Sequence, residues 1–166
     1  IIMNKNVIEF FNSSELVEYK RSIELMEKRV EGINEGKASE LLWFLEHPPI
    51  YTAGTSSNDR DLLNENLFPV FRTNRGGQFT YHGPGQRVAY VMLNVRDRDY
   101  NVKSFIRLLE QWIMESLMDI GIKSFLIKDK IGIWVNNEEK IASLGLRIRK
   151  GISFHGISLN INPNLE

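Results

Sequence analysis

Cysteine is absent from this sequence of 166 residues. The residues given therefore contain no disulfide, no thiolate ligand for a metal and no thiol nucleophile. No apolar run approaches the roughly 20 residues that cross a bilayer, and the chain does not open on a basic region followed by an apolar one, as a secretory leader does. We therefore expect a cytoplasmic protein. Because the chain begins Ile1-Ile2-Met3, we also expect the natural polypeptide to be longer.

Several catalytic and binding motifs are also missing. The sequence has no G-x-x-x-x-G-K-[ST] phosphate loop, no G-x-G-x-x-G after a strand and no H-E-x-x-H zinc motif. His47, His82 and His155 are far apart in sequence, and the segment 151–155 stops short of a serine-hydrolase nucleophile elbow because His155 replaces its last glycine. We expect no metal, no cofactor and no serine hydrolase of that type.

The basic residues are unevenly distributed, although the net charge is zero and 42% of the residues are apolar, enough for one buried core. The segments 72–96 and 140–165 contain no Asp or Glu. They hold eight basic residues: Arg72, Arg75, Arg87, Arg96, Lys140, Arg147, Arg149 and Lys150. If the two segments adjoin, they form a basic face, which suits an acidic protein or an anionic ligand. A basic face could also meet nucleic acid, but the sequence has no nucleic-acid-binding motif.

The hydrophobic pattern predicts a mixed α/β chain. Apolar residues at spacings of three and four predict helices over 16–33, with an N-cap at 12–15, and over 102–120, ending at Gly121. Strands are predicted over 7–11, 41–45, 50–52, 69–73, 87–95, 123–127, 131–135, 141–149 and 152–161.

The segment 75–86, RGGQFTYHGPGQ, joins two predicted strands and contains four glycines. Glycine permits positive φ and a close approach of backbone to a ligand or another strand. The alternative interpretation is a plain turn, which Gly-Pro-Gly forms in many proteins.

Lys140 directly precedes the predicted strand 141–149, and regular alternation would place it on the same face as Ala142 and Leu144. The ammonium would then point to the apolar side, and burial there would lower its pKa enough for it to accept a proton. The alternative is a lysine at a strand end whose ammonium reaches water. His155 falls on an apolar face in the same way, where a hydrogen-bonded core histidine is expected.

Three segments together resemble the lipoyl(octanoyl) transferase family: RGGQFTYHGPGQ at 75–86, KIASLG at 140–145 and HGISLN at 155–160. His47-Pro48-Pro49, followed by Tyr51-Thr52, resembles that family as well. The resemblance implies an α+β fold like that of the biotin and lipoate protein ligases, with a mixed sheet and packed helices. We expect one catalytic domain over 1–166 that lacks its C-terminal segment.

The resemblance implies transfer of an octanoyl group from acyl carrier protein to a lysine of a lipoyl domain, the first step of protein lipoylation. The implied acceptors are lipoyl domains of 2-oxoacid dehydrogenase complexes and the glycine cleavage H protein, with no nucleic acid or membrane partner. Lys140 would lower the pKa of a cysteine thiol. The residues that would line the acyl site are Arg75, Gly76, Gly77, Gln78, Phe79, Thr80, Tyr81, His82, Ser143, Leu144, Gly145, Gly156, Ile157 and Ser158.

The family's cysteine follows its H-G-x-x-L-N segment, and this sequence ends at Glu166 before that position. We hypothesise that the natural chain continues into a proline-cysteine-glycine motif. Three alternatives remain: an ATP-dependent lipoate or biotin ligase, a transferase that uses Ser143 with Lys140, and a non-catalytic module that binds the carrier protein.

Overall fold

The computed structural model describes residues 7–64 and 66–164. Its elements follow the order β1 (Ile8–Asn12), α1 (Tyr19–Asn34), β2 (Glu40–Leu45), β3 (Ile50–Ala53), η1 (Asp59–Asp61), β4 (Val70–Arg72), β5 (Phe79–His82), β6 (Gln86–Met92), η2 (Arg96–Arg98), α2 (Val102–Asp119), β7 (Phe125–Ile127), β8 (Lys130–Trp134), β9 (Lys140–Arg149) and β10 (Ile152–Asn160). The strands form two sheets: a large one in the order β1-β2-β6-β10-β9-β8-β7 and a small one in the order β4-β3-β5. In each sheet one pair, β1 with β2 or β3 with β4, is parallel and the other pairs are antiparallel. The predicted mixed fold is therefore confirmed.

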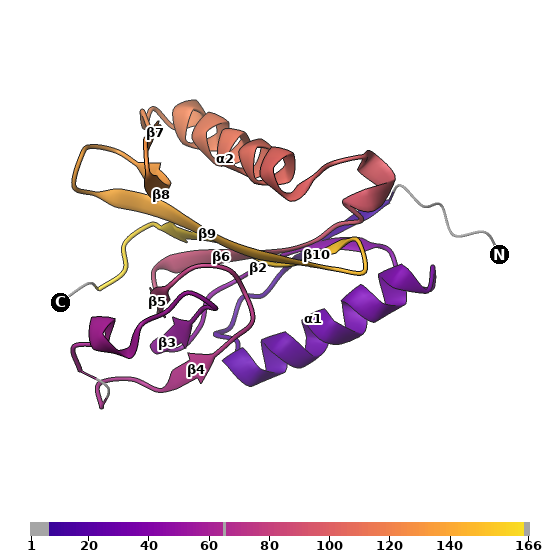
Figure 1. Ribbon diagram of the computed structural model, residues 1–166, viewed down its shortest axis with the longest axis horizontal. Coiled ribbons are helices and arrows are strands. Elements are labelled where there is room, and N and C mark those ends of the chain that lie inside the picture. The colour runs from indigo at the N-terminus through magenta and orange to yellow at the C-terminus, as the bar shows by residue number, and fades with distance from the viewer. Residues whose placement is uncertain (1–6, 65, 165–166) are drawn as a thin grey trace.

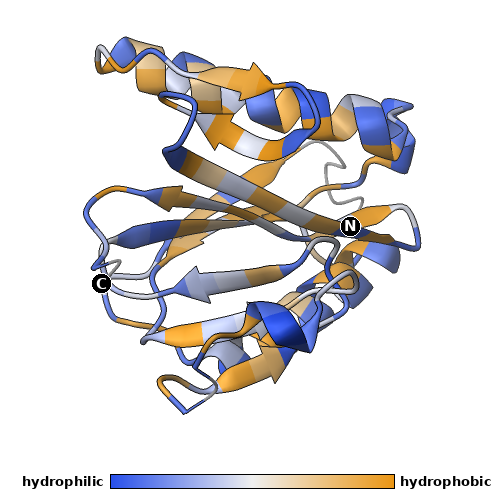
Figure 2. Cartoon of the chain, turned by 60° about the vertical axis from the view of Figure 1, so that its left-hand side comes forward, coloured by the Kyte–Doolittle hydropathy of each residue, from blue (hydrophilic) through white to orange (hydrophobic). Residues whose placement is uncertain are grey.

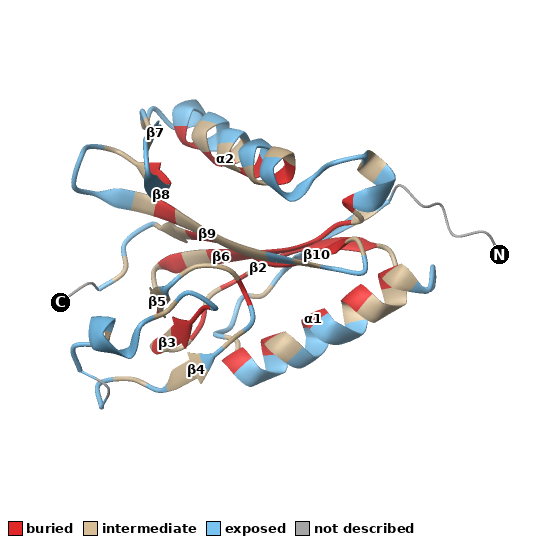
Figure 3. Cartoon of the chain, viewed as in Figure 1, coloured by how far each residue is buried: buried red, intermediate tan, exposed pale blue. Residues whose placement is uncertain are grey.

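The large sheet is covered on both faces (Figure 1). Helix α2 lies over one face, and α1 and the small sheet lie on the other side. The buried residues of both helices point toward the sheet, while their outer faces are exposed (Figure 3). Neither helix in the described part of the chain has the length and hydropathy needed to span a bilayer.

The central strands are apolar because they are buried from both sides. Along β6, Val88, Tyr90 and Met92 pack in the cluster that contains α1, whereas Ala89 and Val91 pack in the cluster that contains α2. Figure 2 shows apolar and polar residues mixed along both the strands and the helices. Because both faces of the central strands are covered, sequence alternation alone does not reveal which of their side chains face a site.

Helix α1 begins at Tyr19, later than the predicted cap at 12–15, which is therefore wrong. The intervening residues stay extended because they bond to β2 and the residue after it: Ser13 N donates to Phe44 O and Val17 N donates to Glu46 O. The Ser13 hydroxyl accepts a hydrogen bond from Trp43 Nε1 at 2.9 Å. Pairing with β2 thus outweighs the local capping preference.

Helix α2 ends as predicted. Asn101 caps its first turn by accepting a hydrogen bond from Ser104 N at 2.9 Å. Gly121, at φ 83°, follows the last turn, and its N–H donates to Met118 O. This positive φ is the conformation that glycine adopts most readily after a helix.

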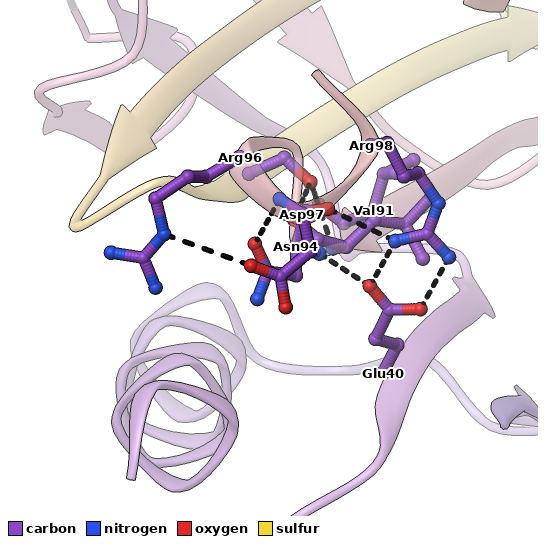
Figure 4. Close-up of polar contacts among 8 residues, drawn as sticks. Glu40, Val91, Asn94, Arg96, Asp97 and Arg98 are labelled. Carbon is purple, nitrogen blue, oxygen red and sulfur yellow. Dashed lines mark hydrogen bonds and ion pairs between the residues drawn. The ribbon is translucent and has the colours of Figure 1, made fainter. Parts of the chain in front are cut away.

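A buried carboxylate ties the start of β2 to the loop that follows β6 (Figure 4). Glu40, whose side chain is 4% exposed, accepts two hydrogen bonds from the Arg98 guanidinium, one of them 2.6 Å long, and another from Asn94 N. Arg98 also donates to Asn94 O at 3.0 Å. The two-pronged geometry is the strong form of this ion pair.

Candidate functional site

A pocket of about 40 Å³ lies between the large sheet, helix α1 and the small sheet. β10 pairs with both β6 and β9, and Gly76 N donates to Leu146 O of β9 at 3.1 Å, so the segments 75–86, 140–145 and 155–160 meet in one place. Of the residues predicted to line the acyl site, those that border this pocket are Arg75, Thr80, His82, Ser143, Leu144, Gly145, Gly156, Ile157 and Ser158. Sequence reasoning missed Tyr19, Val88 and Tyr90, and gave His155 no part in lining the site.

Five predicted residues do not border the pocket: Gly76, Gly77, Gln78, Phe79 and Tyr81. Phe79 and Tyr81 belong to β5, which pairs with β3. The segment is therefore partly a strand and not only a turn.

Arg75 is the buried centre of the glycine segment, with 7% of its surface exposed. Its Nη2 donates to Thr52 O at 2.8 Å, to Thr52 Oγ1 at 2.7 Å and to Gln78 O at 3.0 Å, while Nη1 donates to Gly76 O at 2.9 Å. None of these partners is a carboxylate. Burial lowers the pKa of Arg75 from its ordinary value, but a guanidinium keeps its proton at neutral pH.

The glycines around Arg75 make room for its side chain. A Cβ on Gly54 would lie 2.7 Å from Arg75 Nη1 and 2.2 Å from Gly77 O, and a Cβ on Gly145 would lie 3.0 Å from Arg75 Cδ. Gly77 has φ 94°, a conformation that other residues rarely adopt. These glycines thus enclose a buried cation beside the pocket.

Two of the three histidines bond to buried hydroxyl groups. His47 Nδ1 lies 2.5 Å from Val17 O and its Nε2 lies 2.7 Å from the Tyr90 hydroxyl, so Nδ1 carries the proton. His82 Nδ1 lies 2.6 Å from Gln86 Oε1 and its Nε2 lies 3.3 Å from Thr52 Oγ1. The His47 and His82 rings are 5.8 Å apart.

His155 is buried beside the same site, as expected for a core histidine, and its Nε2 lies 3.3 Å from Asn74 Oδ1. Its φ of 64° is unusual for a residue inside a strand. The β10–β6 pairing runs from Gly156 to Asn160, and Ile152 pairs with Asn94 in the same register, so His155 lies between two paired stretches.

Burial lowers the pKa of all three histidines: His47 to about 4, and His82 and His155 to about 3. Each ring is therefore neutral at physiological pH. Among residues 7–64 and 66–164, no group of three His, Cys, Asp or Glu side chains could hold a metal ion.

Lys140 lies on the opposite face of β9 from the one predicted. Ile133 pairs with Ala142 and Trp134 with Lys140, so two residues of β9 oppose one step of β8 in a bulge. Lys140 therefore shares the face of Trp134 and lies 5.0 Å from that ring, whereas Ala142 faces α2. Regular alternation from Ala142 then returns Ser143 to the Lys140 side, the side of the pocket.

The Lys140 side chain is exposed overall, but its stem lies against β8. A Cβ on Gly132 would be 2.9 Å from Lys140 Cδ. This partial burial lowers the pKa of Lys140 from its ordinary value. Lys140 does not border the pocket itself.

A second, more polar pocket of about 350 Å³ adjoins the first and shares Tyr19 and His155 with it. It is also bordered by Glu27, Arg72 and Asn74. The site thus has a narrow inner part among the motif residues and a wider outer part beside α1.

The two basic segments do adjoin, because β6 pairs with β10, but most of their charge is neutralised. Salt bridges occupy Arg72, Arg87, Arg96, Arg149 and Lys150. The basic residues of these segments for which the described part of the chain has no salt bridge are Arg75, Lys140 and Arg147. The alternation of β9 places Lys140 and Arg147 on the face of the pocket.

Comparison with known proteins identifies the family of this chain. A protein-family model, the lipoyl protein ligase A/B catalytic domain, matches residues 18–166. An octanoyltransferase of Brucella melitensis is 48% identical over 96% of this chain, and the chain spans 65% of that relative's length, less than two thirds. An octanoyltransferase of Ehrlichia chaffeensis is 48% identical over 99% of this chain and 78% of its own.

Solved structures share the fold at low sequence identity. Lipoate-protein ligase A bound with ATP superposes with a TM-score of 0.69 at 19% identity, covering 95% of this chain and 68% of its own. A bipartite lipoate protein ligase from Thermoplasma acidophilum gives 0.66 at 18% identity, with 95% and 62% covered. The chain belongs to the lipoyl protein ligase A/B catalytic domain family.

Proposed function

We propose that the protein transfers an octanoyl group from acyl carrier protein to a lysine of a lipoyl domain through a cysteine thioester. The observation that carries this proposal is the pocket on which three motif segments, distant in sequence, converge. The relatives named octanoyltransferase, at 48% identity, favour transfer over ATP-dependent ligation. Lipoyl domains of 2-oxoacid dehydrogenase complexes and the glycine cleavage H protein are the proposed acceptors.

The acyl chain would enter the inner pocket, where Val88 and Tyr90 of β6 provide apolar walls and glycines leave the backbone accessible. Burial there favours binding by about 0.8 kcal/mol per CH₂ group. The outer pocket, of about 350 Å³, would admit the part of the carrier protein to which the octanoyl group is attached. A residue such as Tyr19, shared by both pockets, would lie at the boundary between acyl chain and arm.

The nucleophile would be a cysteine beyond Glu166, in a continuation of this domain. Lys140 would accept the thiol proton, and the thiolate would attack the thioester carbonyl and release the carrier thiol, which takes up a proton. The acceptor lysine amine would then attack the acyl-enzyme, forming an amide and returning the cysteine. A lysine whose pKa is lowered by partial burial is better suited to this exchange than an ordinary one.

Arg75 would contribute electrostatically. Its charge is fixed by four hydrogen bonds to neutral groups and lies at the pocket wall. A buried cation without a carboxylate stabilises negative charge that develops nearby, because no counter-charge cancels its field. The thioester oxygen acquires such charge during both steps.

The exposed cations Lys140 and Arg147 would steer an acidic carrier protein to this face. On the pocket face of β9, Arg149 has a salt bridge with Glu27, whereas the described part of the chain contains no salt bridge of Lys140 or Arg147. Carrier binding should weaken as the salt concentration rises, and an affinity independent of ionic strength would contradict this role.

A matched pair of filling variants tests where the acyl group binds. Ser143 borders the site, whereas Ser116 borders a larger apolar pocket of about 280 Å³ under α2. We expect Ser143→Phe to abolish octanoyl transfer in the full gene product and Ser116→Phe to retain it. The reverse result would place the acyl chain under α2.

The ligase alternative is favoured by the fold, since one structural neighbour is a ligase bound with ATP. Pyrophosphate release from ATP and octanoic acid by this protein would support the ligase and contradict transfer.

Loss of transfer in Ser143→Ala, with transfer retained after mutation of the downstream cysteine, would identify Ser143 as the nucleophile. Normal carrier binding without transfer would indicate a non-catalytic module.

A further inference from the structure

A continuous series of hydrogen bonds connects Arg75 to the start of β9. Arg75 Nη2 contacts Thr52 Oγ1 at 2.7 Å, which contacts His82 Nε2 at 3.3 Å. The opposite ring nitrogen of His82 contacts Gln86 Oε1 at 2.6 Å. Gln86 Nε2 contacts Asn160 Oδ1 at 2.9 Å, and Asn160 Nδ2 contacts the Lys140 carbonyl at 3.1 Å.

All donors in this series point the same way. Arg75 can only donate, so Thr52 accepts and is free to donate its own hydrogen to His82 Nε2. That assignment leaves the His82 proton on Nδ1, facing Gln86 Oε1, and the Gln86 amide then donates to Asn160. The neutral state of His82 agrees with this tautomer, because burial lowers its pKa to about 3.

The last bond of the series acts where the sheet ladder fails. The β9–β10 pairing ends at Leu159 with Ala142, and the bulge opposite β8 begins at the same point. The Asn160 side chain bonds to the Lys140 carbonyl in place of the next backbone bond. The Gln86 amide also donates to Tyr81 O at 3.1 Å, so it is fixed at both ends.

We propose that Gln86 and Asn160 are positioning residues that hold Lys140 in register with the Arg75 segment. This inference rests on the role of Lys140 in the proposed transfer reaction. The two residues fix the backbone of Lys140, and the bulge then directs its side chain along Gly132 toward the Trp134 ring. Without these bonds the first residue of β9 has no described partner on the β10 side.

The chain provides an internal control for this proposal. The ammonium groups of Lys130 and Lys140 each lie 5.0 Å from the centroid of the Trp134 ring. Lys130 donates to Asn137 O at 3.0 Å and has no hydrogen bond with the series. A change confined to Lys140 therefore separates loss of positioning from a general disturbance of this end of the sheet.

The experiment measures amine acetylation of individual lysines as a function of pH, followed by peptide mass spectrometry. The variants are Gln86→Met and Asn160→Ala, which break the series without adding charge. Asn101→Ala is the control for lost stability, because it removes the cap of α2 away from the site. Thermal unfolding monitored by circular dichroism verifies that each variant is folded.

We expect the midpoint of the Lys140 profile to rise in both variants, because a released stem is better solvated. Acetylation of Lys140 at neutral pH should slow on the order of threefold, while Lys130 in the same sample and Lys140 in Asn101→Ala stay unchanged. An unchanged Lys140 midpoint in both folded variants, or an equal shift at Lys130, would overturn the proposal. The measurement needs no acyl substrate, so a shifted midpoint in a protein without transfer activity would contradict only the proposed function.

Discussion

Two arginines of this protein, Arg98 and Arg75, are stabilised in opposite ways. Arg98 is paired with the Glu40 carboxylate, and 30% of its side chain still reaches solvent (Figure 4). Arg75 is 7% exposed, and its guanidinium bonds to the carbonyls of Gly76 and Gln78 and to the carbonyl and hydroxyl of Thr52. The first arrangement cancels its charge, whereas the second preserves it.

This difference indicates what each region is for. The Glu40–Arg98 ion pair joins β2 to the loop after β6, and its two opposite charges neutralise each other, so it would attract a charged ligand only weakly. A cation surrounded by neutral dipoles costs stability, since carbonyls compensate burial less fully than a carboxylate does. An unpaired buried cation that borders a pocket can act on a bound ligand, and Arg75 borders the inner pocket.

Acid should affect the Arg75 region most, because all three buried histidines lie there. Their pKa values, about 3 to 4 in the fold, are below the ordinary 6.5 of an unfolded chain. The unfolded state therefore binds protons first as the pH falls below 6.5. Stability is complete above that pH and declines by about 1.4 kcal/mol per pH unit for each histidine.

Urea unfolding between pH 7 and 5 measures this decline. His155→Asn, which tolerates the positive φ, should remove about a third of the slope. A free energy of unfolding that stays constant from pH 7 to 5 would contradict the burial of neutral histidines.

Replacing Arg75 is the next largest change. Arg75→Met leaves the carbonyls of Thr52, Gly76 and Gln78 without this donor, and we expect a loss of about 3 kcal/mol in the free energy of unfolding. Octanoyl transfer by the folded fraction should fall on the order of 100-fold. Steady-state kinetics beside urea unfolding separates the two effects, and full activity per folded molecule would show that the charge has no catalytic effect.

Breaking the other arginine's pair should change stability alone. Glu40→Gln keeps the shape of the side chain but leaves Arg98 without a counter-charge, at a cost of about 2 kcal/mol. Because Arg98 can turn to solvent, the cost stays below that of Arg75→Met. A fall in transfer activity per folded molecule would mean that the Glu40–Arg98 pair is coupled to the pocket and does not act on stability alone.

The smallest effect is expected at an exposed ion pair. Lys150 donates to Glu31 at 2.9 Å on the surface, and Lys150→Ala should change the free energy of unfolding by less than about 1 kcal/mol. A much larger loss would show that surface pairing, and not burial, sets the contrast between the arginines.

The sequence predicted the strongly periodic elements and the meeting of the motifs. Local hydrophobic patterns predicted the second helix, its end at Gly121 and most strands, because these elements depend mainly on residues close together in the sequence. The start of α1 was predicted wrongly because backbone bonds from residues 13 and 17 to the β2 region are nonlocal. No local signal in 12–18 announces them.

Two features of the site are also nonlocal. The face of Lys140 depends on a bulge set by the pairing of β8 with β9, so alternation along β9 alone gave the wrong side. The enclosure of Arg75 depends on Gly54, which the sequence places far from the other glycines. Gly54 follows the predicted strand 50–52 by two residues. A glycine at a strand end was the signal that could have identified its part in enclosing Arg75.

We propose that this pocket serves acyl transfer through a cysteine assisted by Lys140. Mass spectrometry of the full gene product, before and after incubation with octanoyl acyl carrier protein, would reveal the acyl-enzyme. We predict one octanoyl adduct on a cysteine beyond Glu166, formed far more slowly in Lys140→Met. An adduct on Ser143, or transfer to a lipoyl domain that requires ATP and leaves no acyl-enzyme, would contradict it.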